Sequence, residues 1–317
     1  MDLSQDTTRS LVSILMPCYN AERYIREAID SALSQTHKNF ELIIIDAEST
    51  DGSVGIIESY KDPRIRLIRH KYEPILATRN SLFKEARGDF LTFLDSDDIY
   101  LPDKIREEVK FLRENEDYAG VYCDLRYFFD GEPNKLYKHR YTFYSGDIFT
   151  ELLDKLFITN TTFMMRRTVL DKVGYYNEAL GMVEDWDYFL RMAYGGHKIG
   201  FLPIDLVRYR LRWDNHTRFS NQVPHQKSTV KIFENLKKQM TREDAKKYNI
   251  DHFIDKRKKR LVIVLLGQGE KKEAWATMRE VGIFSPMTLF FLAPSFVLKK
   301  LVEVAWRERK KGLFIPV

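Results

Sequence analysis

The sequence predicts an α/β protein with a mostly parallel sheet and helices on both of its faces. Three observations lead to this fold class. Short apolar runs alternate with amphipathic stretches along residues 1–114. The run Phe40–Ile45 is almost continuously apolar, as in a parallel strand buried on both faces. Three of the runs lead directly into polar residues, as at the carboxyl edge of an open sheet, where ligands bind.

The expected elements follow in chain order. The first half predicts strands at Leu11–Met16, Phe40–Ile45, Ile65–Ile68 and Phe90–Leu94, and helices at 21–35, 50–60, 75–86 and 101–114. Asn20 stands where a cap of the first helix belongs. The second half predicts strands at Tyr118–Phe129, Thr161–Met165, Ile199–Leu202 and Leu206–Leu211, and helices at 145–157, 166–173 and 184–194. Glycines end the last two helices.

Charge divides the chain into two parts. The 51 Lys and Arg and 46 Asp and Glu give a formal net charge of +5, but residues 1–220 sum to −6 and residues 221–317 to +11. We therefore expect an α/β domain at 1–220 and a basic helical C-terminal region at 221–317. A hydrophobic content of 44% excludes an intrinsically disordered chain.

Cysteine content and the first residues indicate the compartment. The two cysteines, Cys18 and Cys123, are too few for a disulfide framework or a cysteine-rich zinc site. The first ten residues contain no apolar run, so we expect no secretory signal. These features favour a cytoplasmic protein.

Acidic residues follow two of the predicted strands. Asp46 ends one strand, and Asp95, Asp97 and Asp98 follow another. Two carboxylates projecting into one cleft repel each other unless a cation or hydrogen-bond donors lie between them. Mg²⁺ or Mn²⁺, bound by one or two carboxylates and by substrate phosphates, suits this arrangement. The alternative is helix capping, which accounts for Asp98 or Asp103 better than for Asp95.

Two further groups are candidate site residues. Arg79 belongs to the helix that precedes the acidic strand, where it is either solvated surface or a ligand of a base carbonyl or a phosphate. Glu184-Asp185-Trp186-Asp187 begins the helix 184–194, whose buried stripe starts at Trp186. Acids in a first turn commonly serve as caps. A carboxylate there, beside a sugar hydroxyl, is also suited to act as a general base.

The order of these motifs resembles glycosyltransferase family 2. The resemblance covers about residues 10–215. It is carried by the segments VSILMPCYNAERYIREAIDSALSQTHKNFELIIID, STDGS, ATRNSLFKEARGDFLTFLDSDDIYLPDKI, RRTVLDKVGYYNEAL and EDWDYFLRMA. It implies the glycosyltransferase A fold and an inverting, metal-dependent transferase. The domain at 1–220 would then be the catalytic domain.

The resemblance also implies roles for individual residues. Pro17, Tyr19 and Asn20 would line the nucleotide pocket, with the Tyr19 ring near the base. Asp46 and Arg79 would contact a uracil, Asp95 would lie near the ribose, and Asp97 would hold the metal. Asp185 would be the catalytic base, with Glu184 and Trp186 on the acceptor side.

Three residues in two motifs depart from the family pattern. Ala47 and Glu48 stand where the family usually has Asp-Gly, so a base-reading carboxylate is missing and the nucleotide is open. Glu48 also lacks the freedom of glycine to adopt a positive φ. Tyr209-Arg210-Leu211-Arg212 has Arg212 where histidine is frequent, so we assign no ligand role there. His216 is a neighbouring candidate.

The basic C-terminal region allows two interpretations. Residues 281–298 form an uncharged stretch of about the minimum length for a membrane span, but it is interrupted by Gly, Pro, Ser and Thr. With basic clusters on both sides, Lys256–Arg260 among them, it suits an anionic membrane surface. A helical appendage with solvated lysines is the alternative. Nucleic acid is disfavoured because no base-reading motif accompanies the basic run and the remainder is acidic.

We therefore expect a transferase that moves a sugar from a nucleotide-diphospho-sugar, with UDP the family default, to a glycan or lipid-linked acceptor in cell-surface polysaccharide biosynthesis. One alternative is a non-catalytic sugar-nucleotide-binding or scaffold protein, which Ala47 favours and the presence of both Asp97 and Asp185 disfavours. Another is a nucleotidyltransferase, which would require a glycine-rich phosphate loop after the first strand. Pro17-Cys18-Tyr19-Asn20 is not such a loop.

Overall fold

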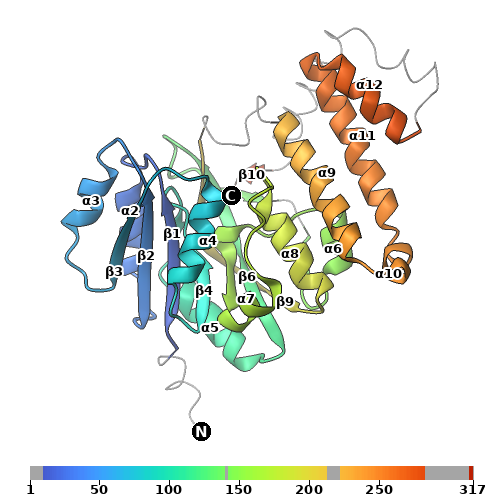
Figure 1. Ribbon diagram of the computed structural model, residues 1–317. Helices are drawn as coiled ribbons and strands as arrows, with labels where there is room; N and C mark the ends of the chain where they lie inside the picture. Colours follow the sequence, from blue (N-terminus) through green and yellow to red (C-terminus); the bar gives the residue numbers. More distant parts are fainter. Residues whose placement is uncertain (1–9, 140–141, 213–221, 283–313, 317) are drawn as a thin grey trace. The chain divides into compact units, whose positions relative to one another are not determined.

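The computed structural model describes residues 10–139, 142–212, 222–282 and 314–316 (Figure 1). They belong to two compact units. The first unit lies within Met1–Glu178 and Tyr188–Arg212 and includes Pro316; the second lies within Ala179–Asp187 and Trp213–Ile315. The neighbouring candidate His216 and all but the first two residues of the apolar stretch 281–298 lie outside the described residues.

The first unit contains a mixed sheet with helices packed on it. Its strands are β1 (Val12–Cys18), β2 (Phe40–Ala47), β3 (Ile65–His70), β4 (Phe90–Phe93), β5 (Ile99–Tyr100), β6 (Tyr118–Phe129), β7 (Tyr137–His139), β8 (Phe163–Arg166) and β9 (Lys198–Leu211). Its helices are α2 (Ile25–Leu33), α3 (Ser53–Ser59), α4 (Ile75–Glu85), α5 (Lys104–Glu114), α6 (Phe149–Asp154), a 3₁₀ turn η2 (Asn160–Thr162) and α7 (Arg167–Val173).

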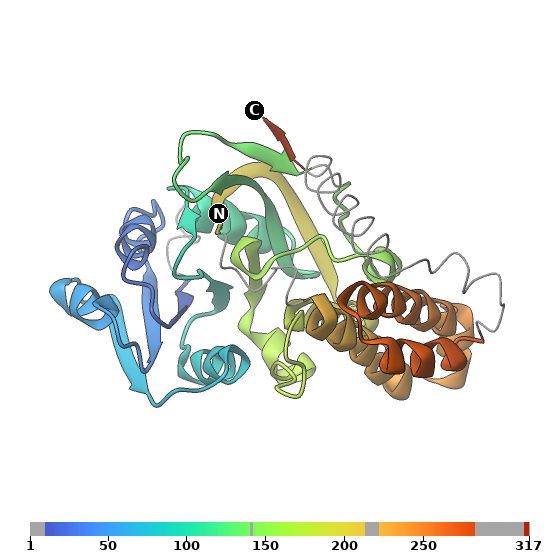
Figure 2. The same ribbon diagram turned by 90° about the horizontal axis from the view of Figure 1, so that it is seen from above.

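The sheet order is β7-β6-β8-β4-β1-β2-β3, and β9 pairs with β5 and β6. β3, β2, β1 and β4 are parallel and lie side by side (Figure 1), whereas β8 pairs antiparallel with both β4 and β6. Figure 2 shows the long strands β6 and β9 running together in a curve. The predicted α/β class is confirmed.

The predicted helix and strand patterns account for most elements of the first unit. All of the β1 side chains are buried, as are Ile25, Ala28, Ile29 and Ala32 on the inner stripe of α2. α7 ends where predicted, because Gly174 has a φ of 78° and supplies the left-handed residue that ends many helices.

In the second half of the α/β unit, three elements differ from their predicted bounds. The helix predicted at 145–157 is confined to α6, because Phe157 and Ile158 are buried in the core on extended chain. The strand predicted at Thr161–Met165 begins later, after η2. The strands predicted at 199–202 and 206–211 are one strand, β9. Its Pro203 lies where the register with β6 shifts between Cys123 and Asp124, and such a bulge tolerates a residue without an N–H.

The second unit is helical. It contains α9 (Gln222–Gln239), α10 (Arg242–Lys247), α11 (Ile250–Gln268) and α12 (Lys271–Glu280), and its boundary with the first unit falls inside α8 (Glu184–Tyr194). α11 packs along α9 and α12 (Figure 1), around a core of Val223, Val230, Leu261, Leu265 and Ala274. A short strand, β10 (Phe314–Pro316), follows later in the chain. None of the helices in the described ranges is long and apolar enough to span a bilayer.

A fully buried ion pair joins α5 to the sheet of the first unit. Lys104 Nζ lies 2.7 Å from Glu108 Oε2, donates to Thr92 Oγ1 at 3.1 Å, and stands 4.2 Å from the centroid of the Tyr100 ring. Burial raises the pKa of Glu108 to about 7, against the opposing effect of the Lys104 charge. The two charges are therefore tolerated only because they are paired.

We predict that Lys104→Met, which leaves Glu108 buried without its cation, lowers the free energy of unfolding by about 3–5 kcal/mol. The double variant Lys104→Met/Glu108→Leu is expected to regain most of this loss, since it removes both charges. Urea unfolding followed by circular dichroism measures both variants. A single variant as stable as the unaltered protein would contradict the prediction.

Candidate active site

The carboxyl ends of β1 and β2 bring together the first group of predicted site residues. In the parallel register Pro17 lies beside Ile45, and Cys18 lies beside Asp46. Pro17 is buried, and Tyr19 and Asn20 follow the strand on the surface. The same edge therefore carries the residues predicted from the two strands, as the topology of an open parallel sheet requires.

Asn20 links the loops after β1 and β2 and does not cap a helix. Its Oδ1 accepts a hydrogen bond from Thr50 N at 2.8 Å, and its own N–H donates to Ser49 Oγ at 2.9 Å. Its φ is 49°, in the left-handed region that asparagine tolerates. The predicted cap was wrong, since α2 begins only at Ile25.

The two carboxylate oxygens of Asp46 differ in their hydrogen bonding. The side chain is only 2% exposed, and Oδ2 accepts the Ser49 N–H at 3.0 Å. Oδ1 is buried and has no hydrogen-bond partner in the part of the chain that the structure describes. Burial, and then the Asp46 charge, raise the pKa of the neighbouring Cys18 thiol to about 12, so this thiol stays protonated. A buried acceptor without a donor is costly unless a ligand supplies one.

The structure shows the conformation of Ala47 and Glu48, the two residues that replace the usual Asp-Gly of the family. Ala47 is buried, and Glu48 adopts a φ of 65° although it is not glycine. The Glu48 carboxylate accepts the Tyr72 N–H at 3.0 Å. The expectation that Glu48 would avoid a positive φ was therefore wrong. This strained conformation is held by a contact to the loop after β3.

Tyr72 is a further candidate site residue, which the sequence did not reveal. Its ring lies edge to face against the Tyr19 ring, with centroids 5.3 Å apart. The two side chains are 63% and 50% exposed, which is unusual for a pair of large aromatic rings. The available signal was a lone tyrosine in the polar segment between β3 and α4.

Arg79 and Asp95 form the second group. Arg79 is only 7% exposed on α4, and its Nη2 lies 2.9 Å from Asp95 Oδ1. The guanidinium also lies 5.5 Å from the centroid of the Phe93 ring. The solvated-surface reading of Arg79 was therefore wrong. The guanidinium neutralises the first acid of the loop after β4.

Asp97 and Asp98 lie deeper in this loop and contact β9. Asp98 Oδ1 accepts the Arg210 N–H at 3.0 Å, and Asp97 Oδ2 lies 3.4 Å from Arg212 Nε. Burial raises the pKa of both carboxyls, and the neighbouring Asp95 charge raises them further. Arg212 thus pairs with Asp97, a contact to which the sequence assigned no role.

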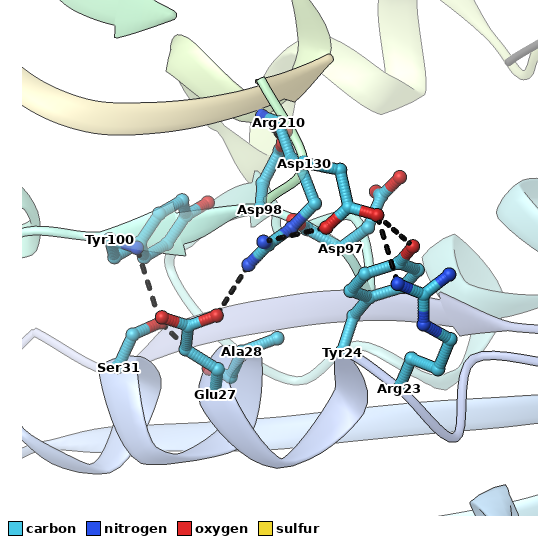
Figure 3. A network of polar contacts seen from close by, with 10 residues as sticks. All are labelled: Arg23, Tyr24, Glu27, Ala28, Ser31, Asp97, Asp98, Tyr100, Asp130 and Arg210. Atoms are coloured by element: carbon cyan, nitrogen blue, oxygen red, sulfur yellow. Dashed lines mark hydrogen bonds and ion pairs between the residues drawn. The ribbon is translucent and has the colours of Figure 1, made fainter. Parts of the chain in front are cut away.

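Arg210 organises a network around the same loop (Figure 3). Its Nε donates to the Asp97 carbonyl at 2.9 Å, and its two Nη atoms pair with Asp130 and with Glu27 of α2. Tyr24 donates its hydroxyl to Asp130 at 2.9 Å. One guanidinium therefore joins β9, α2 and the backbone of the acidic loop.

The donor set around Asp97 fits a hard divalent cation only with help from a ligand. No cluster of three or more His, Cys, Asp or Glu able to hold a metal occurs among the residues that could be examined. A single carboxylate completed by diphosphate oxygens and water is, however, how proteins commonly bind Mg²⁺. Asp97 fits that role, because its ion pair with Arg212, at 3.4 Å, is longer than that of Asp95 with Arg79, at 2.9 Å.

Glu184, Asp185 and Trp186 belong to the second unit, at the start of α8. The Asp185 carboxylate accepts the Trp186 N–H at 2.8 Å. Trp186 is buried, as are Phe189, Leu190 and Ala193 of the predicted stripe, which confirms that prediction. Val183, just before the motif, has a φ of 56°, which a β-branched residue rarely adopts.

Comparison with known proteins gives a consistent assignment. The model of the family described as "Glycosyl transferase family 2" matches residues 13–174. An uncharacterized glycosyltransferase from Rickettsia felis is 34% identical over 209 residues, which cover 65% of this chain and 34% of that protein. The Escherichia coli enzyme WfaP is a UDP-Glc:alpha-D-GlcNAc-diphosphoundecaprenol beta-1,3-glucosyltransferase. It is 34% identical over 173 residues, which cover 52% of this chain and 67% of WfaP.

Solved structures agree on the fold. The mannosyltransferase PcManGT from Pyrobaculum calidifontis, in complex with GDP-Man and Mn²⁺, superposes with a TM-score of 0.60 at 16% identity. The match covers 94% of this chain and 80% of PcManGT. The chain spans about a third of the length of the Rickettsia felis relative. Its parallel strands, the polar loops at their carboxyl ends and these matches show a glycosyltransferase A fold, and the chain belongs to glycosyltransferase family 2.

Proposed function

We propose that the chain transfers a sugar from a nucleotide-diphospho-sugar to a hydroxyl group of a glycan or lipid-linked acceptor, with inversion at the anomeric carbon. The observation that carries this proposal is that Asp46 lies at the carboxyl end of β2, and Asp95 and Asp97 follow β4, two strands that flank β1 in the parallel part of the sheet. In particular, the buried, unsatisfied Oδ1 of Asp46 is suited to accept the N–H of a base. The matched relatives are glycosyltransferases, which supports the donor class.

The nucleotide half of the donor is assigned to the first unit. Pro17, Asn20 and Asp46 surround the base, and the exposed Tyr19 and Tyr72 rings offer it an aromatic face. Arg79, which is paired with Asp95, contacts the base, and Asp95 lies near the ribose. UDP is the first candidate, since WfaP uses UDP-Glc, and GDP the second, since PcManGT was solved with GDP-Man.

The transfer step needs a base and a stabilised leaving group. Asp185 takes the proton of the acceptor hydroxyl, whose oxygen attacks the anomeric carbon as the bond to the diphosphate breaks. The bonding electron pair leaves with the nucleoside diphosphate. Mg²⁺ or Mn²⁺ at Asp97 would offset the charge of the diphosphate. Arg212, 3.4 Å from Asp97, places a fixed positive charge at the same point. Glu184 and Trp186 are assigned to the acceptor side.

The proposed acceptor and location rest on the basic residues of the second unit and on the acceptor of WfaP. We propose the domain limits 1–220 for catalysis and 221–317 for a basic appendage that docks on an anionic membrane surface at the cytoplasmic face. Lys259 and Arg260 of α11 are exposed and suited to such a surface. The lipid-linked acceptor of WfaP supports a similar acceptor here, in cell-surface polysaccharide synthesis.

Turnover is tested by incubating the protein with Mn²⁺ and UDP-Glc, UDP-GlcNAc or GDP-Man, and measuring nucleoside diphosphate release. We expect release from one donor above the enzyme-free rate. Nucleotide binding without release from any donor, with and without a lipid-diphosphate sugar acceptor, would instead favour a non-catalytic sugar-nucleotide-binding protein.

We predict that Asp97→Asn lowers the affinity for UDP in the presence of Mn²⁺ by about tenfold or more, because the cation loses its charged protein ligand. Without Mn²⁺ the variant and the unaltered protein should bind UDP with similar affinity. Isothermal titration calorimetry measures both. Asp103→Asn, at a partly exposed acid that contacts Thr36 and Arg106, is the control. Equal losses in the two variants would contradict the assignment.

We also predict that Tyr72→Ala weakens UDP binding by about 5- to 160-fold, since stacking of a base on an aromatic ring contributes about 1–3 kcal/mol. Tyr175→Ala removes an exposed tyrosine that packs on Phe83 and serves as the matched control. Fluorescence titration with UDP and GDP compares the variants. Unchanged affinity for both nucleotides in Tyr72→Ala would exclude this ring from the base site.

For the membrane role, we predict that the full chain floats with phosphatidylglycerol-containing vesicles but not with phosphatidylcholine vesicles. Lys259→Glu/Arg260→Glu should reduce flotation by about tenfold or more, because each basic residue near an anionic surface contributes about 1 kcal/mol. Lys61→Glu/Lys110→Glu changes the net charge equally at exposed positions of the first unit and is the control. Equal flotation of all three proteins would exclude α11 from the membrane contact.

A further inference from the structure

The basic run Lys256–Arg260 of α11 is not a uniform surface stripe. Arg257 is 0% exposed and faces the interior of the second unit. Its neighbour Lys258 pairs with Glu234 of α9 at 3.0 Å and with Glu280 of α12 at 2.8 Å. Two of the five basic side chains therefore make contacts within the helical unit. A role in membrane binding does not explain why Arg257 is buried.

The guanidinium of Arg257 lies against two aromatic rings. Its central carbon is 4.6 Å from the ring centroid of Trp186 and 4.9 Å from that of Phe233 in α9. The two rings meet edge to face, with centroids 5.5 Å apart and planes at 90°. A buried cation is costly unless nearby groups compensate for its lost hydration, and aromatic faces do so in part. Trp186 is thus held by α9 and α11 together.

Trp186 ends a short strained turn that carries the acidic pair. Val183, at one end of this turn, has a φ of 56°. The Trp186 N–H, at the other end, donates to the Val183 carbonyl at 3.1 Å and to Asp185 Oδ1 at 2.8 Å. Glu184 and Asp185 stand between these two residues. Such strain persists only where the surrounding structure fixes the backbone, and the buried Trp186 side chain supplies that restraint.

We propose that Arg257 is a positioning residue for Glu184 and Asp185. It fixes Trp186 against Phe233, and Trp186 fixes the turn from which the two carboxylates project. This inference rests on the proposed role of Asp185 as the base. It gives the C-terminal helices a part in the transfer step that is separate from membrane docking, because Arg257 is inaccessible to a lipid surface.

A positioning role predicts a change in kcat with little change in nucleotide binding, because the residues assigned to the nucleotide belong to the first unit. Arg257→Met removes the charge but keeps a long apolar side chain. We expect it to lower kcat by about tenfold or more, as misplacement of a reacting group does, with KM for the donor within about twofold. Arg257→Lys, which keeps a cation between the rings, should restore part of this loss.

The assay measures nucleoside diphosphate release from whichever of UDP-Glc, UDP-GlcNAc and GDP-Man is turned over fastest, with water as the acceptor. Calorimetry with UDP and Mn²⁺ and the thermal midpoint of each variant accompany it. Lys258→Met is the matched control. It breaks two ion pairs of the same helix, and is expected to lower the midpoint without lowering kcat. If Arg257→Met does not fold, Arg257→Lys and Trp186→Phe take its place.

The outcomes separate the two levels of the proposal. Asp185→Asn with unaltered kcat overturns the proposed base and the positioning role with it. A second outcome is that Asp185→Asn is inactive but Arg257→Met keeps full kcat. This result overturns the positioning role alone, and so does full kcat in both Arg257→Lys and Trp186→Phe where Arg257→Met does not fold. A kcat loss in Lys258→Met equal to that in Arg257→Met also overturns it, since the effect would then be one of stability. A loss of kcat at Arg257 alone, with intact UDP binding, supports it.

Discussion

The guanidinium of Arg210 is the point at which the acidic loop after β4 is held in place. It is buried against the Tyr24 and Phe128 rings, donates to the Asp97 carbonyl, and pairs with the Glu27 and Asp130 carboxylates. The backbone N–H of Arg210 donates to Asp98 Oδ1. Its charge offsets the repulsion between the Glu27 and Asp130 carboxylates beside the acidic loop. The position of Asp97, on which the proposed diphosphate site depends, therefore rests on a residue of β9, which is more than a hundred positions away in the chain.

Backbone strain marks the same regions. Four non-glycine residues with positive φ occur in the described ranges, and Asn20, Glu48 and Val183 each lie within the loops that carry candidate site residues. Asn20 is held by Ser49 and Thr50, and Glu48 by the backbone of Tyr72. Val183 precedes the turn anchored by Trp186. Strained residues cluster where a fold fixes groups for binding or chemistry, because other contacts offset their cost.

Some candidate site residues could be predicted from the sequence, but the contacts of others could not. Asp46, Asp95 and Asp97 could be found because the ends of buried parallel strands are visible in the hydrophobic pattern. The contacts of Arg79, Arg212 and Tyr72 could not, because an arginine or tyrosine has the same sequence signature whether it is solvated or engaged by a distant residue. The strand break expected at Pro203 was likewise wrong, since the bulge that accommodates this residue is set by β6.

By itself, the sequence determined the alternation of strands and helices, the acidic loops at the strand ends and the family resemblance. These depend on local periodicity and on residues close together in the chain. Only the tertiary structure decided which charges are paired and which face water. In the tertiary structure Arg257, which belongs to a basic run, packs against aromatic rings. Glu48, which has a positive φ, accepts a hydrogen bond from the backbone N–H of Tyr72 in another loop. Burial and long-range pairing arise from the packing of distant segments, so no local pattern encodes them.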